Sequence, residues 1–219
     1  MSETSAEQDR QASRDFFDRL FDTSRELISA FPLTQGPAEM DYIATELESA
    51  VVAKRSTNPF QNPNVKIGSA DPQSEKTAVG LNTVGMLLDR MSILAIKAWN
   101  LDHRAGKPNQ AEHLRNTQVA ELVEALAAAR PGHSSINNKL TSHKTSIDNT
   151  DFASASYNLV TTNLLLWEAQ EILYNHDIAV LPAEELRKYI QFFSKHNLSR
   201  NVSIEASDRL YWAAVQQPE

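Results

Sequence analysis

The stretch LNTVGMLLDRMSILAIKAWNLDHR, residues 81–104, decides the fold. Apolar residues occupy nearly every side of the helix that this stretch predicts, a pattern typical of a helix buried all round. The same helix carries Asp89, Arg90 and Lys97 in its middle. A buried charge is costly unless it is paired, so we expect a central helix whose polar rows face other helices. Gly85 adds to this expectation, because a glycine inside a helix often marks the close approach of another backbone.

The polar residues of this helix fall into two rows. At about 100° per residue, Asn82, Asp89 and Asn100 lie on nearly the same side. Arg90, Lys97 and Arg104 recur at seven-residue spacing and form the second row. The sequence alone does not decide which of these rows is buried.

The rest of the chain is also helical in pattern. It contains only six glycines, strand-like alternation is scarce, and apolar residues recur mostly at spacings of three and four. Helices are expected over residues 8–30, 37–54, 71–103, 108–129, 151–176 and 182–214. We expect residues 1–7 to be disordered, 56–70 to be a connector, and 131–149 to be a long polar loop. The sequence therefore predicts an all-α bundle of about six helices with long central helices, forming one domain over residues 1–219.

The composition excludes several classes of function. There are no cysteines, so disulfides and thiolate metal or redox sites are excluded. The net charge is −7, and residues 1–50 hold eleven acidic but only four basic side chains, which argues against binding to nucleic acid or to anionic lipid. No apolar run is long enough to span a membrane, and we see no signal peptide. These features predict a cytoplasmic protein.

The helices expected over residues 151–176 and 182–214 also carry polar residues among apolar ones. The polar residues could meet those of the 71–103 helix at one shared centre. The candidate catalytic residues are Asp89, Glu168 and Glu171, because carboxylates serve as general bases. The candidate ligand-binding residues are Arg90, Lys97, Asn163, Trp167, Asn197, Arg200 and Asn201.

Two interpretations of this polar centre stay open. It is either a structural network of ion pairs and amides that fixes the register of the helices, or a ligand site. In a ligand site, Arg90, Lys97 and Arg200 would hold an anionic group, while the carboxylates would orient or deprotonate an amine or hydroxyl. Two of the tryptophans could form the walls of such a pocket.

Motifs for metal, phosphate or nucleophilic chemistry are missing from the sequence. A di-iron bundle needs Glu-x-x-His twice, and neither Glu168 nor Glu171 has a histidine three residues later. HExxH, the phosphate-binding loop, the dinucleotide fingerprint and the GxSxG elbow do not occur. We therefore expect no metal and no cofactor.

Three stretches resemble an uncharacterised bacterial all-helical family, a domain of unknown function often encoded beside sugar-transferase genes. They are VGMLLDRMSILAIKAW, NLLLWEAQEI and ELRKYIQFFSKHNLSRNVSIEASDRL, within residues 79–104 and 158–210. The matching residues are Asp89, Arg90, Ser92, Lys97, Trp99, Asn163, Trp167, Glu168, Glu171, Asn197, Arg200, Asn201 and Asp208. This resemblance implies that the polar centre is a shared feature, but it implies no particular reaction.

Two functional hypotheses follow. The first is a small-molecule-binding helical protein for a small polar or anionic metabolite, which could be a cofactor-independent biosynthetic enzyme. The second is a non-catalytic scaffold or partner subunit of a homo- or hetero-oligomer, with an exposed apolar patch around Phe16, Phe17, Phe21 and Phe31.

Overall fold

The computed structural model describes residues 3–33, 39–60, 83–127 and 149–215. Its long helices are α1 (Glu3–Ser29), α4 (Val84–Trp99), α7 (Phe152–Asn175) and α8 (Ala183–Val215). Shorter ones are α2 (Met40–Tyr42), α3 (Glu48–Ala53), α5 (Pro108–Leu114) and α6 (Ala120–Ala127). The π-helical turns η1 (Ile43–Leu47), η3 (Asn100–Arg104) and η4 (Arg115–Val119) and the 3₁₀ turns η2 (Lys54–Thr57) and η5 (Ile178–Val180) connect or extend them. The described residues contain no strand, which confirms the all-α bundle.

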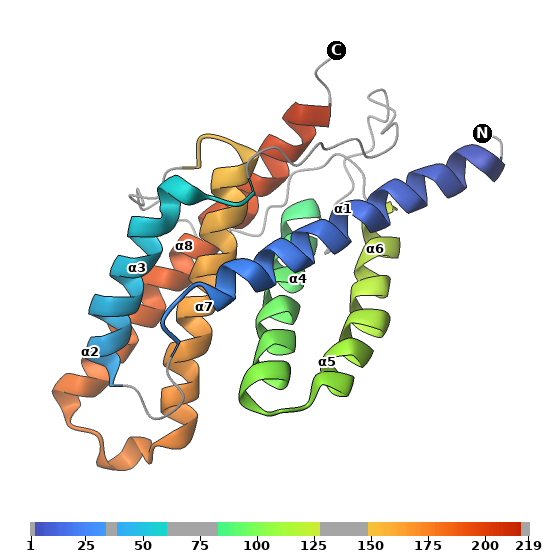
Figure 1. The fold of residues 1–219 in the computed structure, drawn as a ribbon. Helices are drawn as coiled ribbons and strands as arrows, with labels where there is room; N and C mark the ends of the chain where they lie inside the picture. Colours follow the sequence, from blue (N-terminus) through green and yellow to red (C-terminus); the bar gives the residue numbers. More distant parts are fainter. Residues whose placement is uncertain (1–2, 34–38, 61–82, 128–148, 216–219) are drawn as a thin grey trace.

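α4 lies at the centre of the bundle (Figure 1). It packs against α1, α5 and α6 on one side and against α7 and α8 on the other. α7 and α8 form an antiparallel pair, and the α2–α3 segment lies along that pair. α1 crosses the molecule and contacts both α4 and α6. A helix surrounded in this way must be apolar on most sides, which explains the composition of residues 84–99.

Gly85 lets α8 approach α4 closely. A Cβ atom built at Gly85 would lie 2.2 Å from the carbonyl oxygen of Ile204, so any side chain there would collide with backbone. Asp208 reinforces the contact, since its Oδ1 accepts a hydrogen bond of 2.7 Å from the Gly85 N–H. The close approach predicted from the sequence is confirmed.

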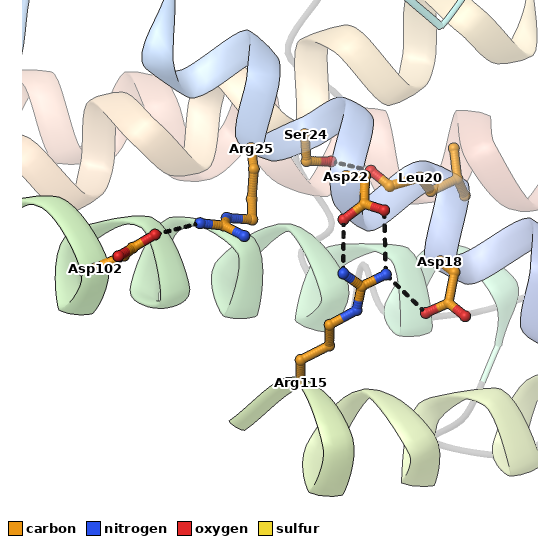
Figure 2. A network of polar contacts seen from close by, with 7 residues as sticks. All are labelled: Asp18, Leu20, Asp22, Ser24, Arg25, Asp102 and Arg115. Carbon is orange, nitrogen blue, oxygen red and sulfur yellow. Dashed lines mark hydrogen bonds and ion pairs between the residues drawn. The ribbon is translucent and has the colours of Figure 1, made fainter. Parts of the chain in front are cut away.

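Surface ion pairs attach α1 to the helices that follow α4 (Figure 2). Arg115 in η4 lies 3.1 Å from Asp22 and 3.5 Å from Asp18, both on α1. Arg25 lies 2.9 Å from Asp102 in η3. Exposed or half-exposed pairs of this kind contribute up to about 1 kcal/mol each, so they orient α1 more than they stabilise it.

The apolar side of α1 is buried, contrary to the patch expected around its phenylalanines. Phe16, Phe17, Phe21 and Phe31 are at most 5% exposed and belong to the core. The periodicity that makes α1 amphipathic turns its phenylalanines into the core, where Phe16 packs against Phe152 of α7 and Tyr211 of α8. The prediction of an exposed patch at these residues is therefore wrong.

Several helix boundaries differ from those expected. α1 already begins at Glu3, so residues 3–7 are helical; extending a formed helix costs little. α4 begins at Val84, where the Thr83 side chain accepts a hydrogen bond from the N–H of Met86 and caps the helix. The expected helix start at residues 71–72 and the loop expected over 131–149 lie outside the described residues, apart from Asn149. No helix of the described parts has the length and hydropathy needed to cross a membrane.

Candidate functional site

Asp89 forms a buried cluster that joins the three central helices. Its side chain is on α4 and is 1% exposed. Its Oδ1 accepts hydrogen bonds from Arg200 Nε on α8 at 2.7 Å and from Asn163 Nδ2 on α7 at 2.9 Å. Its Oδ2 accepts from Arg200 Nη2. Ser92 completes the cluster, because its hydroxyl accepts from Asn163 at 2.6 Å and donates to the Asp89 carbonyl.

This cluster has the properties of a structural ion pair. Arg200 binds both carboxylate oxygens of Asp89, which is the strong bidentate geometry. The hydrogen bond to Asp89 raises the pKa of Arg200, so the guanidinium stays charged. Both oxygens of Asp89 accept hydrogen bonds and the carboxylate is covered, so it is not accessible to take a proton from a substrate.

The second polar row of α4 points away from the cluster. Arg90 and Lys97 are exposed, while Asp89 on the neighbouring row is buried. The site predicted from the sequence needed Arg90 and Lys97 to lie beside Arg200. The structure does not bring these three cations together. The reason is geometric, because one helix cannot turn adjacent residues toward the same neighbour.

Asn197 and Asn201 lie at a third place, in a groove between α7 and α8. The groove has a volume of about 480 Å³. The side chains lining it are mostly apolar: Leu173, Leu186, Tyr189, Ile190, Phe193, Ser194, Asn197 and Asn201. Asn197 is exposed and donates to the carbonyl of Phe193 in its own helix. The two amides are thus separate from both carboxylates.

Glu168 forms a second buried ion pair, with a different partner. It lies on α7, is 3% exposed, and its Oε2 accepts a hydrogen bond of 2.8 Å from Arg104 Nη2 in η3. Burial raises the pKa of Glu168 above its ordinary value, and the bond to Arg104 offsets only part of this. The negative charge of Glu171, one turn along α7, raises it further. Glu171 itself is half-buried and contributes only its charge and its backbone carbonyl, which accepts from Asn175.

Buried polar atoms without hydrogen-bond partners among the described residues occur on Glu168, on Arg104 and on two tryptophans that adjoin them in space or along the chain. They are Glu168 Oε1, Arg104 Nε, Trp99 Nε1 and Trp167 Nε1. The guanidinium of Arg104 lies over the Trp99 ring at 5.7 Å, and Trp167 directly precedes Glu168 on α7. Leaving a buried donor or acceptor unpaired costs about 1–3 kcal/mol, and native proteins pair nearly all of them. We call Glu168, Arg104, Trp99 and Trp167 the Glu168 site.

The other side chains of the Glu168 site are partly exposed although its carboxylate is not. Trp99, Trp167 and Arg104 are each half-buried, whereas Glu168 is 3% exposed. His103 is exposed and stacks on Trp99 with its ring centroid 4.8 Å away. Among the described residues there is no group of three or more His, Asp or Glu that could hold a metal ion.

Tyr42 and Glu46 from the α2–η1 segment lie close enough to affect this site electrostatically. Burial raises the pKa of Tyr42 first, and the charges of Glu46 and Glu168 raise it further, while Arg104 lowers it. Neither residue was a site candidate from the sequence. Nothing in their local sequence marks them, because only the packing of η1 against α7 brings them near Glu168.

Arg104 was missed for a different reason. Its seven-residue spacing from Lys97 and Arg90 places it on the exposed row of a regular α-helix. The chain instead forms the π-helical turn η3, seen in the bond from the Ala105 N–H to the Asn100 carbonyl at 2.9 Å. This wider turn shifts the register, and the Arg104 side chain is only 19% exposed. π-turns are frequent at functional sites, but their positions cannot be read from apolar periodicity.

Comparison of the chain with protein-family models, curated proteins and solved structures found no match. The family resemblance of residues 79–104 and 158–210 thus stays a prediction, and the site has to be interpreted from its own geometry.

Proposed function

We propose that this protein binds a small polar metabolite at the Glu168 site. The observation that carries the proposal is the set of buried polar atoms of Glu168, Arg104, Trp99 and Trp167 that lack a partner among the described residues. The Asp89 cluster takes no part, because its carboxylate is already saturated by Arg200 and Asn163. Its role is to fix the register of α4, α7 and α8.

The unpaired atoms specify a complementary ligand. Arg104 Nε and the two indole Nε1 atoms are donors, so they fit an acceptor oxygen. Glu168 Oε1 is an acceptor when ionised, so it fits a hydroxyl or an amine. The indole rings supply the apolar walls that small-molecule sites usually have. A compact compound with one donor and one acceptor group meets both requirements.

Glu168 is also the residue best suited to move a proton. Its raised pKa brings it closer to neutral pH than an ordinary glutamate, which is the condition for an efficient general acid or base. Arg104 would act as the positioning residue, since it holds Oε2 and leaves Oε1 for the ligand. A cofactor-independent reaction at a hydroxyl or amine, in the cytoplasm, is the catalytic form of this proposal.

Indole ¹⁵N–¹H spectra test the proposal directly. The chain has three tryptophans, of which Trp99 and Trp167 belong to the site and Trp212 lies near the end of α8. We expect titration with ethanolamine, ethylene glycol and glycolate to shift the Trp99 and Trp167 signals saturably for at least one compound, with Trp212 unchanged. A four-atom ligand gains about 6 kcal/mol at best, so the Kd will be tens of micromolar or weaker.

The matched variants are Glu168→Gln and Glu112→Gln, because Glu112 is an exposed glutamate on α5. Glu168→Gln should weaken the response at Trp99, and Glu112→Gln should leave it unchanged. Binding that is equal in both variants, or the absence of any saturable shift in the unmodified protein, contradicts the proposal.

A second candidate function, self-association, is favoured by the tip of the α7–α8 pair. Tyr174, Ile178, Val180 and Ile190 are between 50% and 74% exposed, and Ile190 also lines the 480 Å³ groove. Clustered exposed apolar side chains mark interaction surfaces. A surface with both projecting side chains and a groove can pair with a second copy of itself about a two-fold axis. We therefore propose a second copy of this chain as its partner.

Light scattering after size-exclusion chromatography tests this second candidate. The protein should elute as a dimer, and Ile190→Glu should convert it to a monomer. Val52→Glu is the control, because Val52 is also 61% exposed but lies on α3. A monomer at all concentrations for the unmodified protein contradicts self-association.

A further inference from the structure

We infer that the ligand of the Glu168 site carries an ammonium group, held between the free oxygen of Glu168 and the neighbouring indole of Trp167. This inference rests on the proposed function, because it names the class of compound that the same site accepts. A positively charged group also differs from the anionic group that the sequence assigned to Arg90, Lys97 and Arg200, within an expected small polar or anionic metabolite.

The charges around the site are the first argument. Three carboxylates, Glu46, Glu168 and Glu171, act on Glu168 or on the adjacent Tyr42, together with the guanidinium of Arg104. Arg104 neutralises one of them by its direct bond to Glu168. Arg90 and Lys97, the cations expected to hold an anion, are exposed on another side of α4. The electrostatic balance at the site is thus negative and favours a cation.

The unpaired oxygen of Glu168 also favours an ammonium group. Glu168 is buried, and its Oε1 has no donor among the described residues. A buried carboxylate is stabilised best by charged donors on both oxygens, since charge-assisted hydrogen bonds are about twice as strong as neutral ones. Arg104 supplies this at Oε2, and an ammonium would supply it at Oε1. A hydroxyl could donate to the same oxygen, but it would leave the excess negative charge in place.

The aromatic side chains are the third argument. The guanidinium of Arg104 lies over the Trp99 ring at 5.7 Å and His103 stacks on the same ring, so the indole left for the ammonium is that of Trp167. Tryptophan is the side chain with the strongest cation–π attraction, and cages of aromatic rings with a carboxylate are a recurring way to bind ammonium groups. The unpaired indole and guanidinium N–H groups then require an acceptor elsewhere on the ligand. The class that fits is an amino alcohol or amino acid, with an ammonium and an oxygen a few bonds apart.

The test compares three probes of similar size that differ in charge: ethanolamine is cationic, ethylene glycol is neutral and glycolate is anionic. Kd values come from the indole shifts of Trp99 and Trp167 in the unmodified protein. We expect ethanolamine to bind at least about ten-fold more tightly than ethylene glycol, the effect of one charge-assisted hydrogen bond, and glycolate to bind most weakly.

Two variants test the effect of charge on binding without disturbing the fold. Glu171→Gln and Glu46→Gln remove nearby charge at half-buried or exposed positions, so both variants should fold normally. Each variant should weaken the binding of ethanolamine about two-fold and leave the Kd of ethylene glycol unchanged. Glu112→Gln should change neither Kd. Glu168→Gln should abolish the preference for the amine.

The outcomes distinguish the two proposals. Saturable binding in which glycolate or ethylene glycol equals or exceeds ethanolamine overturns the ammonium inference but leaves the binding function standing. No saturable shift at Trp99 or Trp167 with any of the three probes overturns both. A preference for ethanolamine that survives Glu168→Gln also overturns the inference, because the amine would then be bound elsewhere.

Discussion

Asp89 and Glu168 are two buried carboxylates, and each meets one arginine. Asp89 has both oxygens satisfied, by Arg200 and Asn163, whereas Glu168 keeps one oxygen without a partner among the described residues. Removing one member of a saturated buried pair leaves an uncompensated charge, which is strongly destabilising. Of these two carboxylates, only Glu168 thus has an oxygen left for the ligand that we propose.

Asp89→Asn should lower the free energy of unfolding by about 2–3 kcal/mol, because Arg200 would lose its bidentate partner. The exposed fraction of the Arg200 side chain, 30%, keeps the loss below that of a fully buried pair. Urea denaturation of Asp89→Asn, Arg200→Gln and the double variant measures the coupling. Additive losses in the double variant would show that the pair is not coupled.

Gly85→Ala should destabilise the protein by roughly 2–4 kcal/mol, although alanine is the better helix former, because its Cβ would meet the Ile204 carbonyl. Gly106→Ala is the comparison. Gly106 has a φ of 61° but no atom within 4 Å of its Cβ position, so only backbone strain of about 1 kcal/mol is expected. Thermal unfolding that ranks Gly106→Ala as the more damaging change would contradict the close packing of α4 on α8.

Because His196 is buried, we expect the folded protein to lose stability in mild acid. Burial lowers the pKa of His196 to about 4, and Lys195 lowers it too, while Glu48 raises it. The unfolded chain therefore binds the proton more readily between pH 6.5 and 4, and stability falls as the pH drops through this window, on the order of 2 kcal/mol in all. His196→Gln should flatten this part of the pH profile of urea denaturation. The exposed His113→Gln is the control, and an unchanged slope in His196→Gln would be evidence against a buried neutral imidazole.

At the scale of elements, the π-helical turns η1 and η3 set the positions of residues at the Glu168 site. η3 turns Arg104 inward toward Glu168, and η1 carries Glu46 against α7. Both π-turns continue regular helices, so their apolar periodicity resembles that of ordinary α-helix. The sequence therefore predicted the helices but not the register of the residues after each turn. This is why Glu168 was identified as a candidate and its arginine was not.

The start of α7 offers a test of helix capping. Asp151 precedes α7, and its side chain accepts a hydrogen bond of 2.6 Å from the N–H of Ser154. Asp151→Ala should cost about 1 kcal/mol, the usual value for a lost cap, and Asp151→Ser should restore most of it. Circular dichroism during thermal unfolding measures both. Equal stability of Asp151→Ala and the unmodified protein would mean that the cap contributes nothing.

At the scale of the whole molecule, the fold was more predictable than the site. The spacing of apolar residues predicted the bundle, and a glycine in the middle of a helix predicted the close contact at Gly85. The sequence also identified Asp89, Asn163 and Arg200, whose side chains are joined by hydrogen bonds. It placed in the same site other residues that the fold keeps apart from them. Arg90 and Lys97 face solvent, and Asn197 and Asn201 line the groove. Which polar rows of different helices face each other depends on crossing angles and π-turns, and neither is encoded in single-helix periodicity.

The central claim is that Glu168 serves a ligand and Asp89 serves the fold. Its most direct test measures, for Glu168→Gln and Asp89→Asn side by side, the free energy of unfolding and the Kd of ethanolamine. We predict that Glu168→Gln loses binding but changes stability by less than about 1 kcal/mol, because it removes a poorly compensated buried charge. Asp89→Asn should lose stability while the folded fraction keeps its Kd. A Glu168→Gln variant that is as destabilised as Asp89→Asn and binds ethanolamine as well as the unmodified protein would contradict the claim.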